Sequence, residues 1–398
     1  MRVLHVNSSS LICGGVEVYL RDLFDGLVKR GIEPILAYEM GDGSEFPGSR
    51  KVMGLNDDRI VNRRDRGFHA VRSLLSELRP DVIHVHAVSN HNTIAACLDA
   101  APTFLHIHDY RYLCPASTFH FRATGTNCSL NAGLHCLVRA CTSHCVSRRP
   151  DVAIPALSRV NWVSANFGRF AHIFANSTHV HRRLLSAGAP SQISSVLHYF
   201  CSYPAAIGPA KPASPPYVLF VGRLSPMKGT EDFVRCVASL PPGVRGLVVG
   251  EGTRENTDLI SRTAVETGCD DRIDLIPWKS RAELARVISA AAATIFPSIW
   301  EEPFGLVGPE SQVLGVPVVG YAHGGVTDWL EHDVTGLSVP PRDVAGLAHC
   351  VRRIMEDADL RSRLTRKAAE SVAAKFGREM HLDRLIQRYQ SVIASPSS

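Results

Sequence analysis

The chain has 398 residues and a formal net charge of +5, with 45% hydrophobic and 20% charged residues. This composition is that of a globular protein, and the length exceeds one ordinary core, so we expect two domains with a cleft between them. No apolar run approaches the roughly 20 residues that a membrane-spanning helix needs, which argues against an integral membrane protein. The 11 cysteines show no disulfide framework and the first residues lack the features of a signal peptide, so we expect a cytoplasmic protein.

The first part of the chain alternates short β-type runs with helical or polar stretches. The run VLHVN precedes Gly14-Gly15, a helical stretch from Val16 to Lys29 and the run PILAYE. Further β-type runs are DVIHVHA (81–87), TFLHIHD (103–109), HIFANS (172–177) and ISSVLH (193–198). Such alternation predicts a parallel sheet covered by helices, and we assign residues 1–205 to this first Rossmann-like domain.

A segment rich in Pro, Ala and Gly follows, YPAAIGPAKPASPP (203–216), and within it we place a linker at residues 206–216. The same alternation then restarts and predicts a second doubly wound α/β domain over residues 217–377. The last segment, residues 378–398, has apolar residues at helical spacing: Leu382, Leu385, Ile386, Tyr389 and Ile393. They predict a terminal helix with one buried face.

Positive charge is concentrated in the middle of the chain. Asp151 is the only acidic residue between Tyr110 and Ser214, whereas arginines recur throughout this stretch. The asymmetry favours an anionic partner, which could be phospholipid headgroups, a phosphorylated acceptor or nucleic acid.

Two cations follow the first strand of the second domain. In GRLSPMKG, Arg223 and Lys228 come after VLFV, at the carboxyl end of a predicted strand, where open α/β sheets bind ligands. The planar fork of Arg and the point charge of Lys together suit a diphosphate, although two solvated loop cations would give the same pattern. Gly250 and Gly252 in VVGEG would let a nucleotide approach the backbone closely.

Two carboxylates lie in the segment EEPFGLVGPE, which follows the run TIFPS. Glu302 stands in the loop and Glu310 lies about one turn into the next helix, so both could face one ligand. Gly305 and Gly308 would leave backbone amides bare near the helix N-terminus, which suits anions and sugar hydroxyls. A solvated acidic helix start is the alternative.

The order of these motifs resembles the family-4 retaining glycosyltransferases of the GT-B fold. It runs from Gly14-Gly15-Val-Glu17 through His108-Asp109, GRLSPMKG and VVGEG to the spaced glutamates, over nearly the whole chain. The resemblance implies a metal-independent transferase that moves a hexose-type sugar from a nucleotide diphosphate sugar to a glycan or lipid-linked acceptor, in cell-envelope polysaccharide or glycoconjugate synthesis. It also implies a terminal helix that crosses back to the first, acceptor-side domain. Because the first domain is basic, we further expect that it could dock on the anionic inner face of the plasma membrane.

The same resemblance implies the roles of the site residues. His108 would contact the transferred sugar, and Arg223 and Lys228 would hold the diphosphate. Glu302 would position sugar hydroxyls rather than act as a nucleophile, and Glu310 would bind the ribose. The other donor contacts would come from Gly14, Gly15, Gly222, Gly250, Gly252, Trp278, Phe304, Gly305 and Leu306.

Two positions depart from the family's pattern. Pro277-Trp278 stands where a glycine often precedes the base-binding turn, and Asp328 replaces the usual Glu. Trp278 could stack on the base, or it could be a partly buried core aromatic.

A segment at about residues 110–150 is rich in cysteine and histidine. Its cysteines are Cys114, Cys128, Cys136, Cys141 and Cys145, and His120, His135 and His144 lie among them. This density is typical of a structural metal site, with zinc ahead of an iron–sulfur cluster, although the spacing is not that of standard zinc knuckles. Reduced, unligated cysteines in an acceptor loop are the alternative.

Other functions would use parts of the same sequence. An epimerase or phosphorylase would keep the fold, but no lysine stands out as the pyridoxal lysine that a phosphorylase needs. Nucleic-acid binding would use the basic stretch, yet its arginines are spread out and lack an aromatic stacking pattern, so no nucleic acid partner is expected. A catalytically inactive interaction protein would not need Glu302, Arg223 and Lys228 together.

Overall fold

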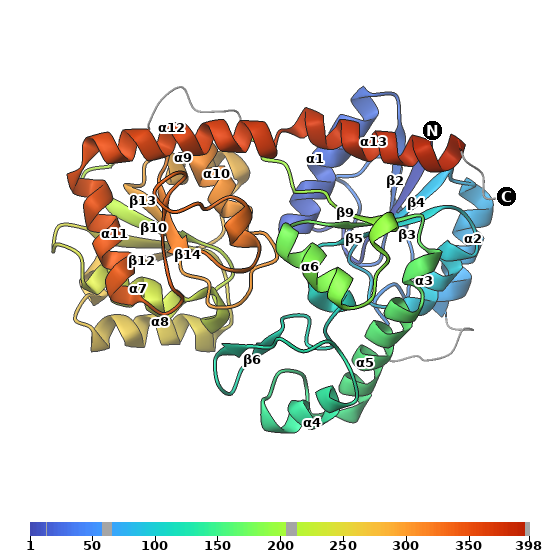
Figure 1. The fold of residues 1–398 in the computed structure, drawn as a ribbon, viewed down its shortest axis with the longest axis horizontal. Coiled ribbons are helices and arrows are strands. Elements are labelled where there is room, and N and C mark those ends of the chain that lie inside the picture. The colour runs from blue at the N-terminus through green and yellow to red at the C-terminus, as the bar shows by residue number, and fades with distance from the viewer. Residues whose placement is uncertain (13, 58–65, 204–212, 395–398) are drawn as a thin grey trace. The chain divides into compact units, whose positions relative to one another are not determined.

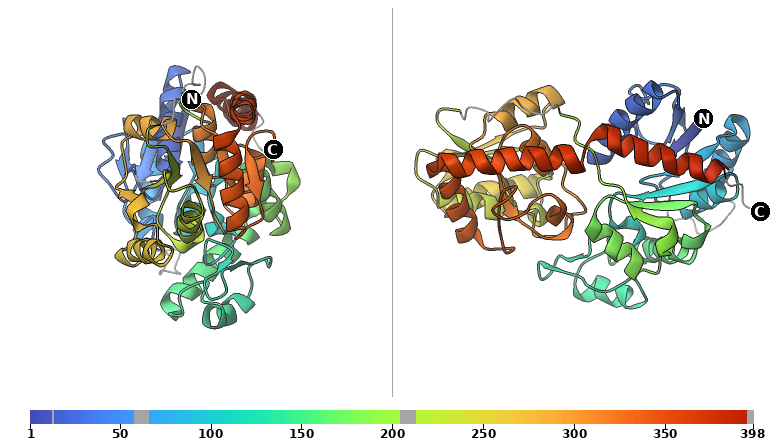
Figure 2. Two further views of the ribbon diagram at one scale, coloured as in Figure 1. Left: turned by 90° about the vertical axis from the view of Figure 1, so that its left-hand side faces the viewer. Right: turned by 45° about the horizontal axis from the view of Figure 1, so that its top comes forward.

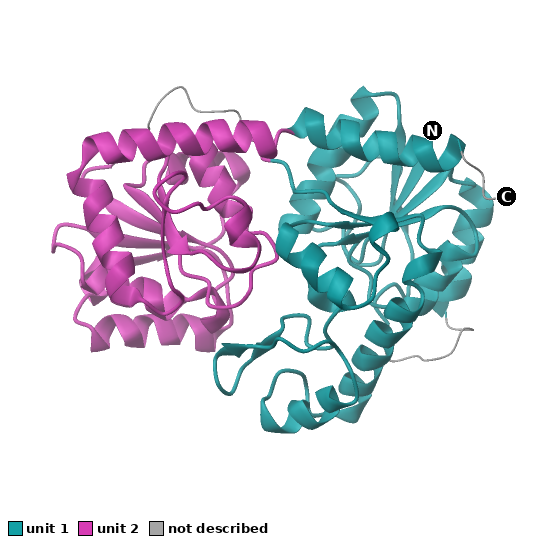
Figure 3. Cartoon of the chain, in the orientation of Figure 1, with its two compact units in different colours: residues 1–200, 378–398 teal, residues 201–377 magenta. Residues whose placement is uncertain are grey.

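The computed structural model describes residues 1–12, 14–57, 66–203 and 213–394, so most of the predicted linker lies outside the described residues. The chain forms two compact units (Figure 3). Unit 1 comprises residues 1–200 and 378–398, and unit 2 comprises residues 201–377. The predicted terminal helix is therefore part of unit 1.

Unit 1 is built on a seven-stranded parallel sheet with the order β3-β2-β1-β4-β5-β8-β9 (Figure 1). Its strands are β1 (Arg2–Val6), β2 (Glu33–Tyr38), β3 (Arg50–Lys51), β4 (Val82–Val85), β5 (Thr103–Ile107), β8 (His172–Ala175) and β9 (Ser194–Val196). The central strands β1, β4 and β5 are almost wholly buried. This burial explains why their sequences are short continuous apolar runs rather than strict alternations.

The helices of unit 1 are α1 (Gly15–Lys29), α2 (Arg66–Leu78), α3 (His91–Leu98), α4 (His135–Thr142), α5 (Pro150–Ala165), α6 (Thr178–Ser186) and α13 (Arg378–Ala394). Ser177 caps α6 by accepting a hydrogen bond from the amide of Val180. Helix α13 lies beside α1 (Figure 1), where Gly26 leaves room for Leu382. The Tyr389 hydroxyl is hydrogen-bonded to Nδ1 of the buried His84, so α13 completes the core of unit 1.

One part of unit 1 lies outside the main sheet. It contains a two-stranded antiparallel ribbon of β6 (His120–Phe121) and β7 (Thr126–Asn127), and helix α4, which contacts α5. Figures 1 and 2 show this part beside α5, away from the parallel strands. It contains the predicted cysteine-rich segment.

Unit 2 repeats the same architecture with a six-stranded parallel sheet of order β12-β11-β10-β13-β14-β15. The strands are β10 (Tyr217–Val221), β11 (Arg245–Val249), β12 (Ile273–Ile276), β13 (Ala293–Phe296), β14 (Val318–Tyr321) and β15 (Leu337–Val339). The helices are α7 (Thr230–Ala238), α8 (Arg254–Glu266), α9 (Arg281–Ser289), α10 (Val307–Val313), α11 (Val344–Glu356) and α12 (Ala358–Lys375). The prediction of two doubly wound α/β sheets is confirmed.

In both sheets the strand order reverses beside the first strand, between β1 and β4 in unit 1 and between β10 and β13 in unit 2. Doubly wound sheets bind ligands at this switch point, outside the carboxyl ends of the strands. In the described part of the chain, no helix combines the length and apolarity that crossing a bilayer requires.

Candidate functional site

The centre of the candidate site is an ion pair at the carboxyl edge of the unit 2 sheet. Lys228 ends a short 3₁₀ turn (Pro226–Lys228) that follows β10, and Glu302 lies in the loop after β13, the neighbouring strand. The Lys228 Nζ donates to both oxygens of Glu302, at 2.8 Å to Oε1 and 2.7 Å to Oε2. The switch point thus brings together two residues that are 74 positions apart in the sequence.

Glu302 is held by more than the lysine. Its Oε2 also accepts hydrogen bonds from Ser298 Oγ at 3.1 Å and from Trp300 Nε1 at 2.9 Å. The side chain is only 8% exposed, and that of Lys228 is 18% exposed. The Lys228 ammonium also lies 5.4 Å from the centroid of the Trp300 ring. A nearly buried carboxylate with these donors is fixed in both charge and orientation.

Arg223 differs from Lys228 in having no internal partner. It is exposed in the loop after β10, and among the described residues it forms no hydrogen bond or ion pair. The backbone beside it is tightly packed, because a Cβ on Gly250 would lie 1.9 Å from the carbonyl oxygen of Gly222. Gly250 is therefore required where the loops after β10 and β11 meet, whether or not a nucleotide approaches it. Gly252 likewise faces Leu224.

The other predicted donor residues of unit 2 differ in exposure. Trp278 follows β12 and is 42% exposed, so its ring is partly buried and partly accessible, and base stacking stays a prediction. Phe304 is 1% exposed, and its carbonyl accepts from Trp329 Nε1, so it belongs to the core. Gly305 and Leu306 lead into α10, and Glu310 lies within that helix, partly buried.

The expectation that Gly308 leaves a bare amide is wrong. Its N–H donates to the carbonyl oxygen of Gly305 at 3.1 Å, and the ring of Trp329 lies where a Cβ would be. The helix α10 is also only seven residues long. Gly308 is therefore required by packing, a reason that sequence spacing alone does not reveal.

At the carboxyl edge of the unit 1 sheet, polar side chains gather around the start of α1. Gly14 is the N-cap of α1 and Gly15 its first residue, and Glu17 is buried in the first turn. Burial raises the pKa of the Glu17 carboxyl, while hydrogen bonds from its own backbone and from Asn7 act in the opposite direction. Glu17 belongs to the first motif of the sequence, but nothing in the spacing marked it as buried.

Asp109, directly after the predicted His108, forms a two-pronged ion pair with Arg111. Arg111 Nη2 lies 2.8 Å from Asp109 Oδ2, and Nε lies 3.0 Å from Oδ1. Although burial raises the pKa of the Asp109 carboxyl, Arg111 outweighs it and the pKa is lowered. This pair was not predicted as part of the site. The signal was present, because Asp and Arg stand two residues apart at the end of a strand.

His108 is tied into a buried hydrogen-bonded chain of histidines. His5 Nδ1 lies 2.9 Å from His86 Nε2, His86 Nδ1 lies 2.8 Å from His108 Nε2, and His108 Nδ1 contacts the Tyr199 hydroxyl. Both ring nitrogens of His108 thus have internal partners. A hydrogen bond from the ring to a sugar would have to replace Tyr199 or His86, so the predicted sugar contact stays a prediction.

The chain belongs to a larger group that we call the histidine array: His5, His84, His86, His106 and His108. They come from alternate positions of β1, β4, β5 and the residues just after, and all except His108 are fully buried. His106 stacks on His108 with ring centroids 4.2 Å apart, and neither of its nitrogens has a hydrogen-bond partner among the described residues.

Several nitrogens of the array lie close enough to share a metal ion. Ring nitrogens of His5, His84 and His86, and of His86, His106 and His108, lie within 4.8 Å of one another. His86 belongs to both groups, yet its two nitrogens are already used by His5 and His108. We therefore assign the array to internal hydrogen bonding and stacking.

Burial holds the histidine array neutral. It lowers the pKa of His5 from 6.5 to about 3, and that of His381, which bonds Tyr19 beside the array, to about 4. Burial and the neighbouring imidazoles lower the pKa values of His84, His86 and His108 well below the ordinary value. Each of these rings is therefore uncharged at neutral pH.

Several cations of the basic stretch have acidic partners inside unit 1. They include Arg111, paired with Asp109, Arg149, paired with Asp151, and Arg169, paired with Asp99. Arg159 is 4% exposed and donates to the carbonyl oxygen of Arg111. The charge asymmetry of the sequence therefore overstates the charge that is free to meet an anionic partner.

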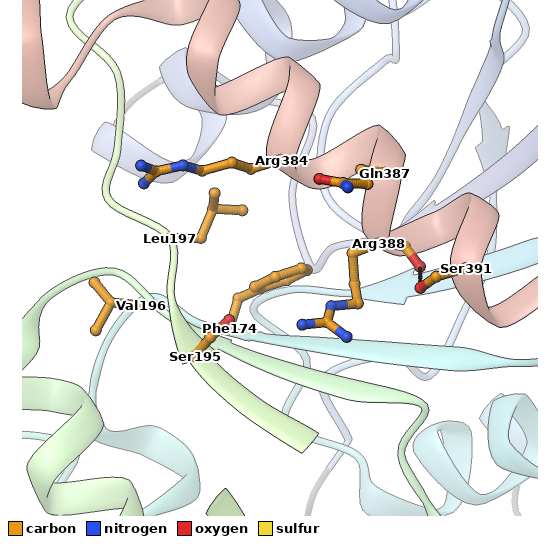
Figure 4. Close-up of a pocket in the computed structure, with 8 residues that line it drawn as sticks. All are labelled: Phe174, Ser195, Val196, Leu197, Arg384, Gln387, Arg388 and Ser391. Atoms are coloured by element: carbon orange, nitrogen blue, oxygen red, sulfur yellow. Dashed lines mark hydrogen bonds between the residues drawn. The ribbon is translucent and has the colours of Figure 1, made fainter. Parts of the chain in front are cut away.

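A separate hollow of about 440 Å³ lies in unit 1 between α13 and the edge strand β9 (Figure 4). Arg384 projects from α13 above Leu197, and Arg388 lies beside Phe174 of β8. Neither arginine forms a hydrogen bond or ion pair through its guanidinium with a described residue. No predicted site residue lines this hollow.

The structure brings four of the five predicted metal-binding cysteines to one place. Cys114, Cys128, Cys136 and Cys145 line one small hollow beside β6, whereas Cys141 is exposed and does not line it.

Comparisons with known families match both units. The family described as Glycosyltransferase Family 4 matches residues 13–198, and the family described as Glycosyl transferases group 1 matches residues 208–371. Two curated relatives are named D-inositol 3-phosphate glycosyltransferase. That of Mycobacterium marinum is 36% identical over 180 residues, 44% of this chain and 38% of the relative. The relative from Mycolicibacterium smegmatis is 33% identical over 186 residues, which are 46% of this chain and 42% of the relative. The match thus spans about two fifths of each relative's length.

Solved structures share the architecture of the whole chain. Anabaena HepE, crystallised with UDP, has a TM-score of 0.74 and 18% identity, covering 98% of this chain and 100% of that one. Sucrose-phosphate synthase from Thermosynechococcus elongatus also has a TM-score of 0.74 and 18% identity, covering 99% and 100%. At 18% identity, these two similarities are evidence for the fold alone.

The histidine array predicts that unit 1 loses stability in mild acid. The folded pKa values lie below the ordinary 6.5, so protons bind preferentially to the unfolded chain as the pH falls below 6.5. At pH 5 each histidine that is held neutral lowers the free energy of unfolding by about 2 kcal/mol. The protection of the β1, β4 and β5 amides against hydrogen exchange, corrected for the slower intrinsic exchange in acid, should therefore fall steeply between about pH 6.5 and pH 4.5.

The matched variant for this prediction is His106→Phe. It removes one titrating ring without removing a hydrogen bond, because neither nitrogen of His106 has a partner in the described part of the chain. The acid midpoint of unit 1 should move to lower pH in this variant. An unchanged midpoint would contradict the assignment.

Proposed function

The chain belongs to the family-4 glycosyltransferases of the GT-B fold, and from this premise we propose that it is a retaining hexosyltransferase. Its donor is a nucleotide diphosphate sugar, and its acceptor is a hydroxyl of a glycan or lipid-linked saccharide in the synthesis of cell-envelope polysaccharide or glycoconjugates. The observation that carries the proposal is the Lys228–Glu302 pair beside the unpartnered Arg223, at the sheet edge where such folds bind ligands.

The cations suit the diphosphate of the donor. Arg223 is exposed and without a partner among the described residues, and Lys228 reaches the same edge on a short turn. Structures of Anabaena HepE with UDP and with UDP-glucose support a donor of this class. We assign the diphosphate to these two cations and the base to the exposed Trp278.

Bond cleavage places negative charge on the departing diphosphate while the sugar passes through an oxocarbenium-like state. Lys228 and Arg223 stabilise this charge, and a well-placed donor is worth about 3–4 kcal/mol in such a transition state. The acceptor hydroxyl attacks on the face from which the diphosphate leaves, and its proton passes to a phosphate oxygen. These two cations meet the developing charge, so the proposal assigns no metal to the reaction.

Glu302 positions the sugar in this scheme. In the present structure its carboxylate is directed by Ser298 and Trp300 and neutralised by Lys228. When the donor arrives, Lys228 turns toward the phosphate, and the carboxylate oxygens that it leaves accept hydrogen bonds from sugar hydroxyls. Ser298 and Trp300 keep the carboxylate in place during this exchange.

Unit 1 supplies the acceptor side in this proposal. Glu17, Asp109 and Arg111 lie near one another at its sheet edge, as their mutual electrostatic effects show. The names of the curated relatives add a phosphorylated cyclitol, inositol 3-phosphate, to the acceptors worth testing. Arg111 is the cation at this edge that could meet such a phosphate.

Attachment to an anionic inner leaflet is part of the proposal and rests on exposed cations such as Arg384 and Arg388. Flotation with vesicles should require anionic lipid and weaken as salt is raised. The double variant Arg384→Gln/Arg388→Gln should float less. Equal binding to neutral vesicles, or no binding at all, would remove this part of the proposal.

The kinetic test is Glu302→Gln with the preferred nucleotide sugar. Because the carboxylate acts in positioning, kcat should fall by at least about 100-fold, while the KM for the donor changes by less than about threefold. Glu301→Gln is the matched control, because Glu302 rather than Glu301 receives Lys228, Ser298 and Trp300. The product's anomeric configuration, read by NMR, should equal that of the donor.

Two outcomes would contradict the assignment. One is a Glu302→Ala variant that transfers sugar at the wild-type rate. The other is a product with inverted configuration.

A further inference from the structure

The cysteine segment, residues 113–149, is buried mainly at its start, at Leu113, Cys114, Pro115, Phe119 and His120. Among residues 121–149, all of which the structure describes, only Ala140 is buried. Its regular structure is limited to the two-residue strands β6 and β7 and the eight-residue helix α4. Leu134 and Val138 are 79% and 65% exposed. A segment that buries so little apolar surface needs another source of order.

Four thiols converge within this segment. Cys114, Cys128, Cys136 and Cys145 come from four separate places in the chain and line one hollow, and none forms a disulfide. The space available to a water-sized sphere in it is about 20 Å³. A space of this size corresponds to about one water molecule or one ion.

Two of the four thiols lie beside backbone N–H groups, although burial raises the pKa of both thiols overall. At Cys114, three such N–H groups act against the effect of burial. These N–H groups belong to Phe119, Thr118 and Ala116. The Cys145 sulfur receives the N–H of Val146 in the same way. Amides that donate to sulfur stabilise the deprotonated ligand that a metal requires.

The charges around the hollow also favour a metal ion bound by thiolates. A divalent ion with four thiolates carries two negative charges, and the surrounding sequence holds cations without acidic residues. Arg139 lines the hollow, and Arg183 donates to the carbonyl oxygen of Cys128. The basic character of this stretch is therefore what a buried dianionic centre needs.

We propose that the hollow is a structural zinc site whose ligands are the thiolates of Cys114, Cys128, Cys136 and Cys145. Zinc prefers four sulfur ligands in a tetrahedron at about 2.3 Å, and such a closed site orders a segment rather than performing chemistry. Among the described residues, no three of these sulfurs lie within 4.8 Å of one another, so the side chains turn inward on binding. Each thiol releases its proton as it binds.

The site differs from the five-cysteine prediction in one residue. Cys141 is exposed and does not line the hollow. His135 and His144 are exposed as well. Cys141 therefore provides a matched control on the same helix as Cys136.

The test is metal analysis of the full chain purified without chelators, with a serine substitution at each cysteine of the segment. Wild type and Cys141→Ser should contain about one zinc per chain, and the other four variants should contain at least about fivefold less. Cobalt in place of zinc should give the absorption bands of tetrahedral sulfur coordination. Zinc below about a tenth per chain in wild type, or equal loss in Cys141→Ser, would overturn the proposal. Iron with acid-labile sulfide, or two disulfides found by thiol counting, would also overturn it.

A second measurement keeps the proposal testable if a variant fails to fold. Removing zinc from the wild-type chain with a chelator should increase hydrogen exchange in residues 113–149 and leave β10–β15 unchanged. Binding of a nucleoside diphosphate to unit 2 should survive this treatment. Loss of zinc without any change in exchange would contradict a structural role.

Discussion

The account depends on one interaction, the ion pair between Lys228 and Glu302 at the carboxyl edge of the unit 2 sheet. A carboxylate that is 8% exposed remains charged at low cost only when a cation and further donors surround it. Ser298, Trp300 and Lys228 meet this requirement, and the strand order β10-β13 brings them together. In the proposed function, Lys228 of this pair also binds the diphosphate, so one residue would serve both the burial of Glu302 and the binding of the donor.

In unit 1 the buried polar groups are histidines, and they are uncharged. Five histidines lie in or beside its central strands, and burial prevents them from being charged. His5, His86 and His108 hydrogen-bond to one another, His108 also bonds Tyr199, and His84 bonds Tyr389. His106 stacks on His108. His108 therefore reaches the sheet edge in a fixed orientation. This rigidity has a consequence for acid stability, because every ring must stay neutral for the unit to remain packed.

The fold could be predicted from the sequence because buried parallel strands are short continuous apolar runs, as in VLFV before Arg223 and TIFPS before Glu302. The pairing of Lys228 with Glu302 could not, since it depends on which strands are neighbours. The histidine array left a signal, in that His84 and His86, and likewise His106 and His108, are two residues apart and so share a face. The contact between His5 and His86 depends on the pairing of β1 with β4, which the sequence alone does not show. The prediction for Gly308 was wrong because the sequence does not distinguish the two reasons for a glycine. One is space for a neighbouring side chain, here Trp329, and the other is an accessible backbone amide.

The most direct test of the central claim is calorimetric titration of wild type and Lys228→Met with UDP, GDP and ADP. The account predicts that one of them binds wild type with one site per chain, and that its affinity falls at least about tenfold in the variant, because a charged hydrogen bond to phosphate is lost. If no nucleoside diphosphate binds, or if the variant binds as tightly as wild type, Lys228 does not hold the donor and the account is wrong.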